Sequence, residues 1–386
     1  MSARRGVTIL GSTGSIGRNT VELVEASPEL YRVEALVANS RVDILADQVR
    51  RLKPRVAVVA DESAYPALKD ALAGTGTEVA AGAAAVADAA DLPAEWVMAS
   101  IVGAAGLAPT LRAIRRGATI GLANKEVLVC AGSLVMAEIE THGATLVPVD
   151  SEHSAIFQVL DTRQRDQVEK IILTASGGPF RTKDRAYMAS VTPEQAVAHP
   201  NWSMGAKISV DSASMFNKGL EMIEAYHLFS MPEEQIDVVV HPQSVVHSLV
   251  AYRDGSVLAQ LGSPDMRTPI SLALGWPNRI SAPVPRLDLA AIATLTFEAP
   301  DPERFPALRL AREAMRAGSS VTAVLNAANE VAVAAFLGRR IGFLDIARVV
   351  EKTIDGVNHR DLGSIEDVLA QDQTARRHAE SVIGQL

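Results

Sequence analysis

The sequence predicts an α/β protein: an N-terminal doubly wound parallel sheet, then a central α+β region, then a C-terminal helical bundle. Three observations support this prediction. Short apolar, β-rich runs alternate with amphipathic segments over the first 150 residues, this alternation stops after Asp150, and helical patterns fill the chain from residue 303 onward. Alternating strands and helices are typical of a parallel sheet that is covered on both faces.

The N-terminal elements follow one another closely. Strands are expected at 7–10, 33–38, 55–60, 96–100, 118–123 and 144–149, and the clearest intervening helices at 20–26, 42–52 and 109–116. These runs are short and rich in β-branched residues, as buried parallel strands are.

The central and C-terminal elements have a different pattern. A strand within 170–180 leads into a Gly–Gly–Pro loop, and 249–261 predicts two strands joined at Asp254–Gly255, a hairpin signal. Eight prolines between 264 and 306 indicate a connector along the surface. Helices that would form a small bundle are expected at 308–316, 321–337, 344–354 and 365–383.

Composition narrows the class of protein. The net charge of −8 argues against nonspecific binding to nucleic acid or anionic membranes. A single cysteine, Cys130, excludes an intramolecular disulfide framework and indicates a reducing compartment. No uninterrupted apolar run approaches the roughly 18 residues of a membrane span, and the few residues before the first strand leave no room for a targeting peptide. We therefore expect a cytoplasmic, multidomain protein.

The sequence GSTGSIG at 11–17 follows the first strand and opens a helix. Glycines at such a turn let the backbone approach a pyrophosphate, and the helix N-terminus favours its negative charge. The position predicts a Rossmann-like dinucleotide site, although the G-x-x-G-x-x-G spacing departs from the usual G-x-G-x-x-G. A glycine-rich turn without a ligand is the alternative.

The end of the second strand indicates which nicotinamide cofactor binds. NAD sites usually have an acidic residue there, whereas this chain has Asn39, Ser40 and Arg41. A carboxylate would repel a 2′-phosphate, and Ser40 and Arg41 could receive it. We predict NADPH rather than NADH, although Asp43 nearby weakens the argument slightly.

Three carboxylates suggest a divalent metal. Asp150 and Glu152 follow a strand at the sheet edge where α/β proteins gather their ligands, and an extended chain would point both the same way. With Glu221 they give hard oxygen ligands suited to Mg²⁺ or Mn²⁺. His153 could favour a transition metal or carry a proton. The alternative for Asp150 and Glu152 is a helix cap with an acidic first turn.

The segment KISVDSASMFNKGLE at 207–221 has the composition of an anion site. The hydroxyl of Ser212, the amide of Asn217 and the ammonium of Lys218 all suit phosphate oxygens. Glu221 follows Asn217 by four residues and Lys218 by three, so on a helix these side chains share a face. The alternative is an ordinary helix with Ser212 as its N-cap and an exposed Lys–Glu pair.

Two further stretches carry candidate residues. Asn124, Lys125 and Glu126 follow a strand at the same sheet edge, where the lysine could stabilise developing negative charge or simply be a solvated loop residue. His199 and Trp202 lie in a long irregular stretch with the composition of a lid. The remaining histidines considered, which we expect to be structural, interfacial or packed, are His227, His241 and His247.

Taken together, these motifs resemble the 1-deoxy-D-xylulose 5-phosphate reductoisomerase family. The segments that carry the resemblance run in order from residue 11 to 337: GSTGSIG, IVGAAGL, LANKE, VDSEHSAIFQ, TASGGPF, HPNWSMG, KISVDSASMFNKGLE, HPQSVVHS and LNAANEVAVAAFL. Several are weak individually, and the combination is specific. Mainly the C-terminal tail lacks a signature.

The resemblance implies a function and a set of site residues. The activity is the NADPH- and metal-dependent rearrangement and reduction of 1-deoxy-D-xylulose 5-phosphate to 2-C-methyl-D-erythritol 4-phosphate, in non-mevalonate isoprenoid synthesis. Implied cofactor contacts are Thr13, Gly14, Ser15, Ile16, Asn39, Arg41, Asn124, Glu126 and Gly205. Implied metal ligands are Asp150, Glu152 and Glu221. Residues implied around the sugar phosphate are Lys125, Ser151, Glu152, Ser176, His199, Ser212, Asn217 and Lys218, with Trp202 on the lid.

The resemblance also implies a homodimer, and one region that could form it is 236–261. Similar proteins often have a basic residue followed by Asn after the second strand, so the resemblance leaves open whether Ser40 or Arg41 holds the 2′-phosphate. The expected organisation is an NADPH-binding domain at 1–150, a catalytic domain with a lid loop that binds metal and substrate at 151–285, a connector at 286–302 and a helical domain at 303–386.

Two other functions fit the cofactor domain. A different NADP-dependent dehydrogenase would need neither three carboxylates nor a phosphate clamp, and a noncatalytic NADPH-binding regulator would not oxidise its cofactor. Chelation of the metal would stop a reductoisomerase but not the other dehydrogenase. Substrate-dependent oxidation of NADPH would exclude the regulator.

Overall fold

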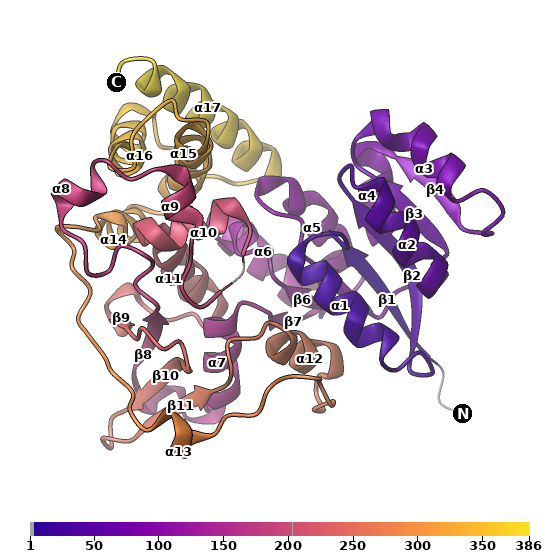
Figure 1. Ribbon diagram of the computed structural model, residues 1–386, viewed down its shortest axis with the longest axis horizontal. Helices are drawn as coiled ribbons and strands as arrows, with labels where there is room; N and C mark the ends of the chain where they lie inside the picture. The colour runs from indigo at the N-terminus through magenta and orange to yellow at the C-terminus, as the bar shows by residue number, and fades with distance from the viewer. Residues whose placement is uncertain (1–3, 203) are drawn as a thin grey trace. The chain divides into compact units, whose positions relative to one another are not determined.

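A computed structural model describes residues 4–202 and 204–386 (Figure 1). The chain forms two compact units. Unit 1 contains residues 4–124, 137–154 and 265–285, and unit 2 contains the described residues of 125–136, 155–264 and 286–386. Two helices, α6 (Glu126–His142) and α7 (Ser151–Val159), begin in one unit and end in the other.

Unit 1 is built on a seven-stranded parallel sheet with the order β4-β3-β2-β1-β5-β6-β7. The chain moves outward in one direction through β1 to β4 and returns to start at β5 beside β1, so the topological switch lies between β1 and β5. Ligands of such sheets bind at the carboxyl ends of the strands next to this point. The strands are β1 (Arg5–Leu10), β2 (Tyr31–Ala38), β3 (Val56–Val59), β4 (Glu78–Ala81), β5 (Trp96–Ala99), β6 (Thr119–Leu122) and β7 (Thr145–Pro148).

Helices cover this sheet, which confirms the predicted doubly wound class. They are α1 (Ser15–Glu25), α2 (Val42–Leu52), α3 (Tyr65–Ala71), α4 (Gly82–Ala90), α5 (Leu107–Arg115) and α12 (Arg267–Gly275), with 3₁₀ turns at η1 (Glu62–Ala64) and η2 (Ala104–Gly106). The six expected strands are all present. The structure adds one strand that was not predicted, the edge strand β4, in which Glu78 is exposed and the other three residues are half-buried.

Helix α12 corrects the expectation that the proline-rich region is only a surface connector. Pro269 lies in the first turn of α12, where a missing N–H breaks no helical hydrogen bond. Trp96 Nε1 donates to Ala273 O at 2.9 Å, and the Arg5 guanidinium donates to Leu274 O at 2.7 Å. These bonds hold α12 in unit 1. Residues 286–302, by contrast, are largely exposed; they contain the short helix α13 (Leu289–Ile292) and an antiparallel bridge between Glu298 and Val240.

Unit 2 has a four-stranded mixed sheet with the order β11-β10-β8-β9. The strands are β8 (Val168–Ala175), β9 (Ile236–Val240), β10 (Val246–Tyr252) and β11 (Val257–Leu261). Pairs β8–β10 and β10–β11 are antiparallel, which confirms the predicted α+β character, and β8–β9 is parallel. The predicted hairpin is present: Gly255 has φ 90°, and Asp254 accepts a hydrogen bond from the Ser256 N–H at 2.8 Å.

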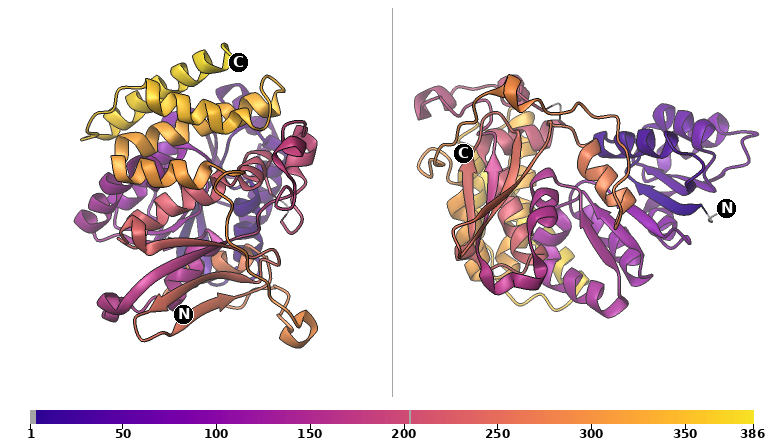
Figure 2. Two further views of the ribbon diagram at one scale, coloured as in Figure 1. Left: turned by 90° about the vertical axis from the view of Figure 1, so that its left-hand side faces the viewer. Right: turned by 90° about the horizontal axis from the view of Figure 1, so that it is seen from below.

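The helices of unit 2 gather mainly on one side of this sheet (Figures 1 and 2). They are α8 (Arg185–Met188), α9 (Pro193–Val197), α10 (Ala206–Ser214), α11 (Phe216–Leu228), α14 (Ala307–Ala317), α15 (Ser319–Leu337), α16 (Asp345–Gly356) and α17 (Ile365–Ile383), with 3₁₀ turns η3 (Thr162–Gln167) and η4 (Glu233–Gln235). The last four match the predicted C-terminal helices to within a few residues.

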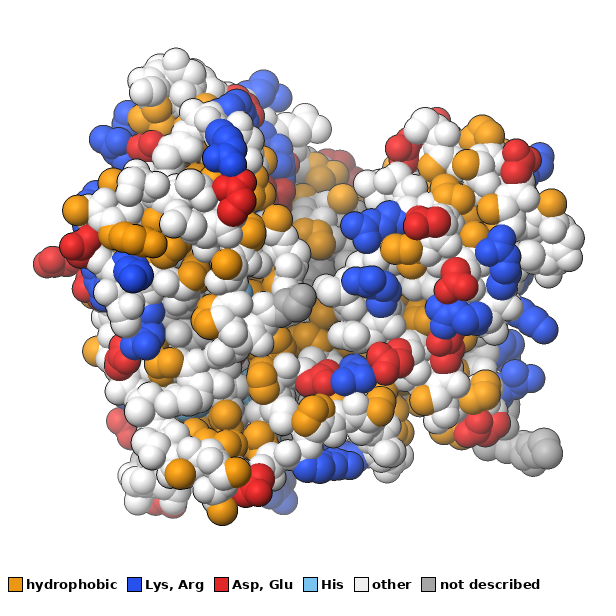
Figure 3. All heavy atoms as spheres, viewed as in Figure 1, with side chains coloured by type: hydrophobic (Ala, Val, Ile, Leu, Met, Phe, Trp, Pro, Cys, Tyr) orange, Lys and Arg blue, Asp and Glu red, His pale blue; other side chains and the backbone are white. Residues whose placement is uncertain are grey.

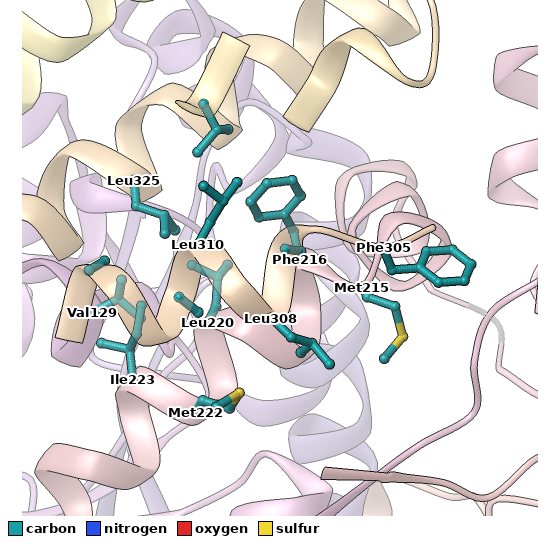
Figure 4. Packing of buried hydrophobic residues seen from close by; sticks show 14 of the residues in the cluster. Val129, Met215, Phe216, Leu220, Met222, Ile223, Phe305, Leu308, Leu310 and Leu325 are labelled. Atoms are coloured by element: carbon teal, nitrogen blue, oxygen red, sulfur yellow. The ribbon is translucent and has the colours of Figure 1, made fainter. Parts of the chain in front are cut away.

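The core of unit 2 fixes α11. Phe216, Leu220 and Ile223 are fully or almost fully buried, and they lie against Leu308 and Leu310 of α14 (Figure 4). Gly219 permits this packing, because a Cβ there would lie 3.1 Å from the carbonyl oxygen of Ala307 and 3.2 Å from the Ala311 Cβ. The face of α11 that carries polar site residues is therefore held by an apolar face on its other side.

Helix α15 has the length and composition of a membrane span, with a mean hydropathy of 1.4 over its most apolar window. However, 83% of that window is buried inside the structure, as in the central helix of a globular bundle. On the molecular face drawn in Figure 3, basic and acidic side chains are interspersed. Exposed ion pairs such as Arg309–Glu313 contribute only about 0–1 kcal/mol each, so burial of apolar side chains is what stabilises each unit.

Candidate active site

The glycine-rich loop shows a separate reason for each glycine. Gly11 has φ 89°, a conformation that a side chain would strain. A Cβ on Gly17 would lie 2.2 Å from the Gly11 carbonyl oxygen, so only glycine lets α1 approach β1 this closely. Gly14 is the exposed N-cap of α1, and a Cβ there would point into open space apart from one contact at 3.4 Å. This leaves the N-terminus of α1 open to a ligand's phosphates.

Thr13, Ser15 and Ile16, the other predicted cofactor residues of this loop, surround that open position. Thr13 is buried beneath it, Ser15 is exposed and Ile16 is half-buried. Gln48 of α2 donates to the Ser12 carbonyl oxygen at 2.8 Å, which braces the loop from below. The arrangement can bind an anion through backbone N–H groups and the helix dipole.

The residues after β2 are placed as the sequence predicted. Asn39, Ser40 and Arg41 are exposed at the carboxyl end of β2, which pairs with β1. Arg41 occupies the N-cap position of α2 and makes no side-chain cap bond there. Its guanidinium can therefore reach a phosphate without breaking a cap.

Asn124 is more buried than a surface contact residue would be. Its side-chain amide donates to the carbonyl oxygens of Ile101 and Gly103, the latter at 2.9 Å. The side chain is only 2% exposed, and it ties the loop after β5 to the end of β6. Asn124 thus shapes the switch-point loop, and its contact with a cofactor remains a prediction.

The acidic pair at the start of α7 corrects one part of the sequence analysis. Asp150 and Glu152 do not lie on an extended chain, because β7 ends at Pro148 and α7 begins at Ser151. The backbone N–H of Glu152 donates to Asp150 Oδ1 at 3.4 Å, so the capped-helix alternative describes the backbone correctly. The two carboxylates still present oxygens within 4.8 Å of each other. The start of a helix, rather than an extended strand, therefore brings the two carboxylates together.

Two neighbours line this acidic pair. Ser151 Oγ donates to Glu152 Oε2 at 2.5 Å. His153 is fully buried, with Nδ1 3.6 Å from Asp150 Oδ1. Both side chains belong to the first turn of α7, so their positions are set by the same helix start.

The segment 207–221 is two helices rather than one. Met215 has φ 65° and separates α10 from α11. Ser212 lies inside α10, so the alternative in which it caps the helix carrying Glu221 is wrong. Asn217, Lys218 and Glu221 share one face of α11, as their spacing predicted.

Glu221 is the centre of a buried polar cluster in unit 2. Lys125 Nζ lies 3.1 Å from Glu221 Oε1 and 2.9 Å from Asn217 Oδ1. Lys218 Nζ contacts Glu221 Oε2, and the Asn217 amide donates to Oε1. All three charged side chains are at most 7% exposed. Two ammonium groups thus hold one buried carboxylate in place.

A second polar group forms around His199. Its Nδ1 accepts from the backbone N–H groups of Asn201 and Trp202 at 3.1 and 3.0 Å, so Nε2 carries the proton and donates to Ser176 Oγ at 2.8 Å. Burial lowers the pKa of His199, which favours this neutral form. Trp202 also lies near His247, with ring centroids 6.3 Å apart. His199 of the predicted lid is therefore hydrogen-bonded to Ser176, a predicted substrate residue. Residue Ser203 of the predicted lid lies outside the described residues.

The loop of Ser176 also reaches α10. Gly178 has φ 65°, and a Cβ on it would lie 2.8 Å from the Ser212 carbonyl oxygen. Gly178 N–H donates to Ser176 Oγ at 3.1 Å. The Gly–Gly–Pro loop that carries Ser176 therefore packs, through Gly178, against the backbone of α10 at Ser212. Gly205, a predicted cofactor residue, is the N-cap of α10.

Lys207 and Asp211 are two residues that the sequence analysis did not single out. Lys207 Nζ lies 3.3 Å from Glu126 Oε1 and 2.7 Å from Asp211 Oδ2. Burial opposes the charge on Lys207, but Asp211 and Glu126 outweigh it and raise the pKa of the ammonium. The i,i+4 spacing of Lys207 and Asp211 was a readable signal for the pair, whereas nothing in the sequence pointed to Glu126 as the third member.

Two of the remaining histidines, His241 and His227, contact the surrounding protein closely. His241 contacts Thr296 O through Nδ1 at 2.8 Å and accepts from Val245 N–H through Nε2 at 3.2 Å. The ring of His227 packs so closely on Gly132 that a Cβ there would lie 2.3 Å from it. Neither residue has the surroundings of a catalytic group.

His227 should make the protein sensitive to mild acid. Burial lowers the pKa of His227 from 6.5 to about 4, so the unfolded chain takes up a proton that the folded chain resists. We expect the free energy of unfolding to fall as pH drops from about 6.5 to about 4, by at most about 3 kcal/mol. Urea titrations across this range should show a shallower decline for His227→Leu, and the exposed His359→Leu should retain the wild-type slope. An unchanged slope in His227→Leu would contradict the assignment.

Comparison with known proteins gives a consistent result along the chain. Family models match residues 7–132 (1-deoxy-D-xylulose 5-phosphate reductoisomerase), 146–229 (its C-terminal domain) and 261–378 (DXP reductoisomerase C-terminal domain). A Rhodospirillum centenum protein named 1-deoxy-D-xylulose 5-phosphate reductoisomerase is 67% identical, covering 98% of this chain and 94% of that protein. One from Zymomonas mobilis is 57% identical over the full length of both.

Solved structures agree with these relatives. The Zymomonas mobilis reductoisomerase in complex with NADPH has a TM-score of 0.94 and 55% identity, and the match covers 100% of both chains. A DOX-P reductoisomerase in complex with NADPH, fosmidomycin and magnesium has a TM-score of 0.95 and 45% identity, with 98% of each chain covered. The similarity therefore extends over both units.

Proposed function

The chain belongs to the 1-deoxy-D-xylulose 5-phosphate reductoisomerase family, and from this premise we propose that it converts 1-deoxy-D-xylulose 5-phosphate to 2-C-methyl-D-erythritol 4-phosphate with NADPH and a divalent metal ion. The observation that carries the proposal is the buried cluster of Lys125, Asn217, Lys218 and Glu221. In it, donors that we assign to the substrate would lie next to the carboxylate that we assign to the metal. A dehydrogenase without a metal or phosphate would have no use for this cluster. The two solved structures named above are complexes with NADPH, and one of them also contains magnesium.

The proposed cofactor site uses the carboxyl ends of the unit 1 strands. The open N-terminus of α1 at Gly14 would bind the pyrophosphate through backbone N–H groups, with Thr13, Ser15 and Ile16 around it. Asn39, Ser40 and Arg41 would hold the adenosine ribose and its 2′-phosphate. The remaining proposed contacts are Asn124, Glu126 and Gly205.

Arg41 should determine the preference for NADPH. A guanidinium–phosphate contact is worth about 1.5–3 kcal/mol, so Arg41→Ala should raise the KM for NADPH roughly 10- to 100-fold. The KM for NADH should not change, because NADH lacks the 2′-phosphate. Initial rates with both cofactors measure this, with Ser40→Ala as the matched variant. Equal effects of Arg41→Ala on both cofactors would assign the 2′-phosphate to another residue.

The proposed metal ligands are Asp150, Glu152 and Glu221, and they fit a hard divalent ion because all three offer carboxylate oxygens. When bound, the ion would polarise the substrate's ketone and adjacent hydroxyl, and NADPH would supply the hydride for the reduction. Among these residues, Asp150 and Glu152 already converge at the start of α7. Lys125 and Lys218 contact Glu221 and hold its carboxylate in place.

The proposed substrate contacts form two groups, one at the phosphate and one at the reacting carbons. Ser176, Ser212, Asn217 and Lys218 supply hydroxyl, amide and ammonium donors for the phosphate, remote from the reacting carbons. Lys125, Ser151 and Glu152 would hold the oxygens near the metal. His199 and Trp202 would close over the substrate, and His199 in its neutral form would orient Ser176 through Nε2–H. Phosphate binding energy would then help to drive this closure.

One assay tests the proposed reaction. The purified protein is mixed with NADPH, Mg²⁺ or Mn²⁺ and 1-deoxy-D-xylulose 5-phosphate, and the loss of NADPH absorbance is followed while the product is identified by mass and NMR. We expect substrate-dependent oxidation that EDTA stops and added metal restores. Oxidation that resists EDTA would favour another NADP-dependent dehydrogenase. NADPH binding without oxidation would favour a noncatalytic regulator.

We also propose that the protein is a cytoplasmic homodimer that pairs through β11. This strand is an unpaired edge of the unit 2 sheet, and its Val257 and Leu258 are 53% and 48% exposed. An exposed apolar edge is a ready place for a second sheet to add. Light scattering should give the mass of a dimer for the wild type and of a monomer for Leu258→Lys. A monomeric wild type at micromolar concentration would contradict this proposal.

A further inference from the structure

Helix α15 of the C-terminal bundle carries two polar side chains where an apolar core is expected. Asn326 and Asn329 are both 0% exposed, although most of α15 is apolar. A buried amide destabilises a fold unless it is hydrogen-bonded. Their spacing of three residues puts both on the same side of the helix. Their hydrogen-bond partners therefore show which residues outside α15 these amides contact.

Asn329 begins a chain of buried contacts that leaves the bundle. Its side-chain amide donates to Asp211 Oδ1 of α10 at 2.8 Å, and Lys207 Nζ lies 2.7 Å from the other oxygen, Oδ2. Lys207 Nζ also lies 3.3 Å from Glu126 Oε1 at the start of α6. Asp211 and Glu126 are 1% and 7% exposed. Each carboxylate oxygen of Asp211 thus has a defined partner, and the chain ends on Glu126.

Asn326 makes a second connection to the same helix. Its amide donates to Cys130 Sγ of α6 at 3.3 Å and to Glu330 Oε1 at 3.0 Å. Arg376 of α17 in turn pairs with Glu330. Cys130 lies one helical turn after Glu126. Helix α15 therefore contacts the first turns of α6 directly at Cys130, and indirectly at Glu126 through Asp211 and Lys207.

We infer that Asn329 is a positioning residue for the cofactor site and acts through Asp211 and Lys207 on the carboxylate of Glu126. This inference rests on the proposed function, in which Glu126 contacts NADPH. Lys207 contacts Oε1, so Oε2 of the same carboxylate can accept a hydrogen bond from a ligand hydroxyl. Loss of the Asn329 amide releases Asp211, which then no longer fixes Lys207. The carboxylate of Glu126 then loses the contact that fixes its orientation.

The test separates positioning from stability. Asn329→Ala should raise the Kd and KM for NADPH about five- to tenfold, while kcat at saturating NADPH and the KM for the sugar phosphate change less than twofold. The matched control is Gln371→Ala, which removes another buried amide of the bundle, one that donates to Asn358 O at 3.0 Å. Gln371→Ala should lower the Tm without changing NADPH binding. Fluorescence titration with NADPH and initial rates give these constants.

Lys207 provides an independent test at a partly exposed position. Lys207→Met should weaken NADPH binding about as much as Asn329→Ala does, and Lys207→Arg, which retains the charge, should restore most of it. Because both residues act in one chain, the double variant Lys207→Met with Asn329→Ala should bind NADPH no more weakly than the worse single variant. NADPH constants within twofold of wild type in Lys207→Met, or equal losses for NADPH and substrate, would overturn the inference.

The outcome also distinguishes this inference from the proposed function. A wild-type protein that binds NADPH and consumes it with substrate, while the Lys207 and Asn329 variants bind NADPH normally, would overturn the positioning role alone. A wild-type protein that neither binds nor oxidises NADPH would overturn both.

Discussion

Glu221→Gln should reduce turnover by roughly 10³-fold while NADPH still binds. The substitution keeps the size of the side chain but removes the charge that a divalent ion needs, and metal assistance is worth several kcal/mol of barrier. It also removes the counter-charge that Lys125 and Lys218 share in a buried cluster. Measured kcat at saturating substrate, together with NADPH titration by fluorescence, checks this expectation.

A matched control keeps the effect of Glu221→Gln interpretable. Glu233 is also a buried carboxylate of unit 2 held by two cations, Arg312 and Arg316, but it lies outside the proposed site. Glu233→Gln should lower the free energy of unfolding and leave kcat unchanged. Equal losses of kcat in the two variants would mean that Glu221 acts only through stability. Normal turnover in Glu221→Gln would remove it from the site.

Lys218→Met should reduce kcat/KM for the sugar phosphate roughly 100-fold, mostly through KM. A charge-assisted contact to phosphate contributes about 1.5–3 kcal/mol. Lys218, with a side chain 3% exposed, supplies the ammonium among the residues that we assign to the phosphate. The Kd for NADPH should not change. With 1-deoxy-D-xylulose, which lacks the phosphate, the variant and the wild type should show similar rates.

The control for Lys218→Met is Lys170→Met. Lys170 pairs with Asp237 at 3.0 Å on the surface of the unit 2 sheet, far less buried than Lys218. Kinetic constants of Lys170→Met should match the wild type. If Lys218→Met loses the same factor with the phosphorylated and the unphosphorylated substrate, then its ammonium does not bind the phosphate.

The parallel sheet could be predicted because its strands are buried on both faces and therefore form apolar runs. The strand β4 could not, since its residues Glu78–Ala81 lie at an edge and are partly exposed. Helix α12 was hidden by neighbouring prolines, although Pro269 occupies a first-turn position where a helix accepts it. Local sequence signals thus identified the inner strands of the sheet better than its edge strand β4 and the later helix α12.

The site shows the same division. Spacing on a helix correctly placed Asn217, Lys218 and Glu221 on one face. The backbone at Asp150 was mispredicted, because a residue after a strand can either extend the strand or cap the next helix, and only the complete turn decides between them. The pairing of Lys207 with Glu126 was not readable at all, since it joins residues 81 apart in the sequence. Contacts of this kind depend on tertiary packing.

Crystals of the protein grown with NADPH and Mn²⁺, and measured for the anomalous signal of manganese, would locate the metal ion. We expect one strong peak within about 2.5 Å of carboxylate oxygens from Asp150, Glu152 and Glu221. A peak elsewhere would contradict it. So would a peak on Asp150 and Glu152 alone, with Glu221 still held by Lys125 and Lys218.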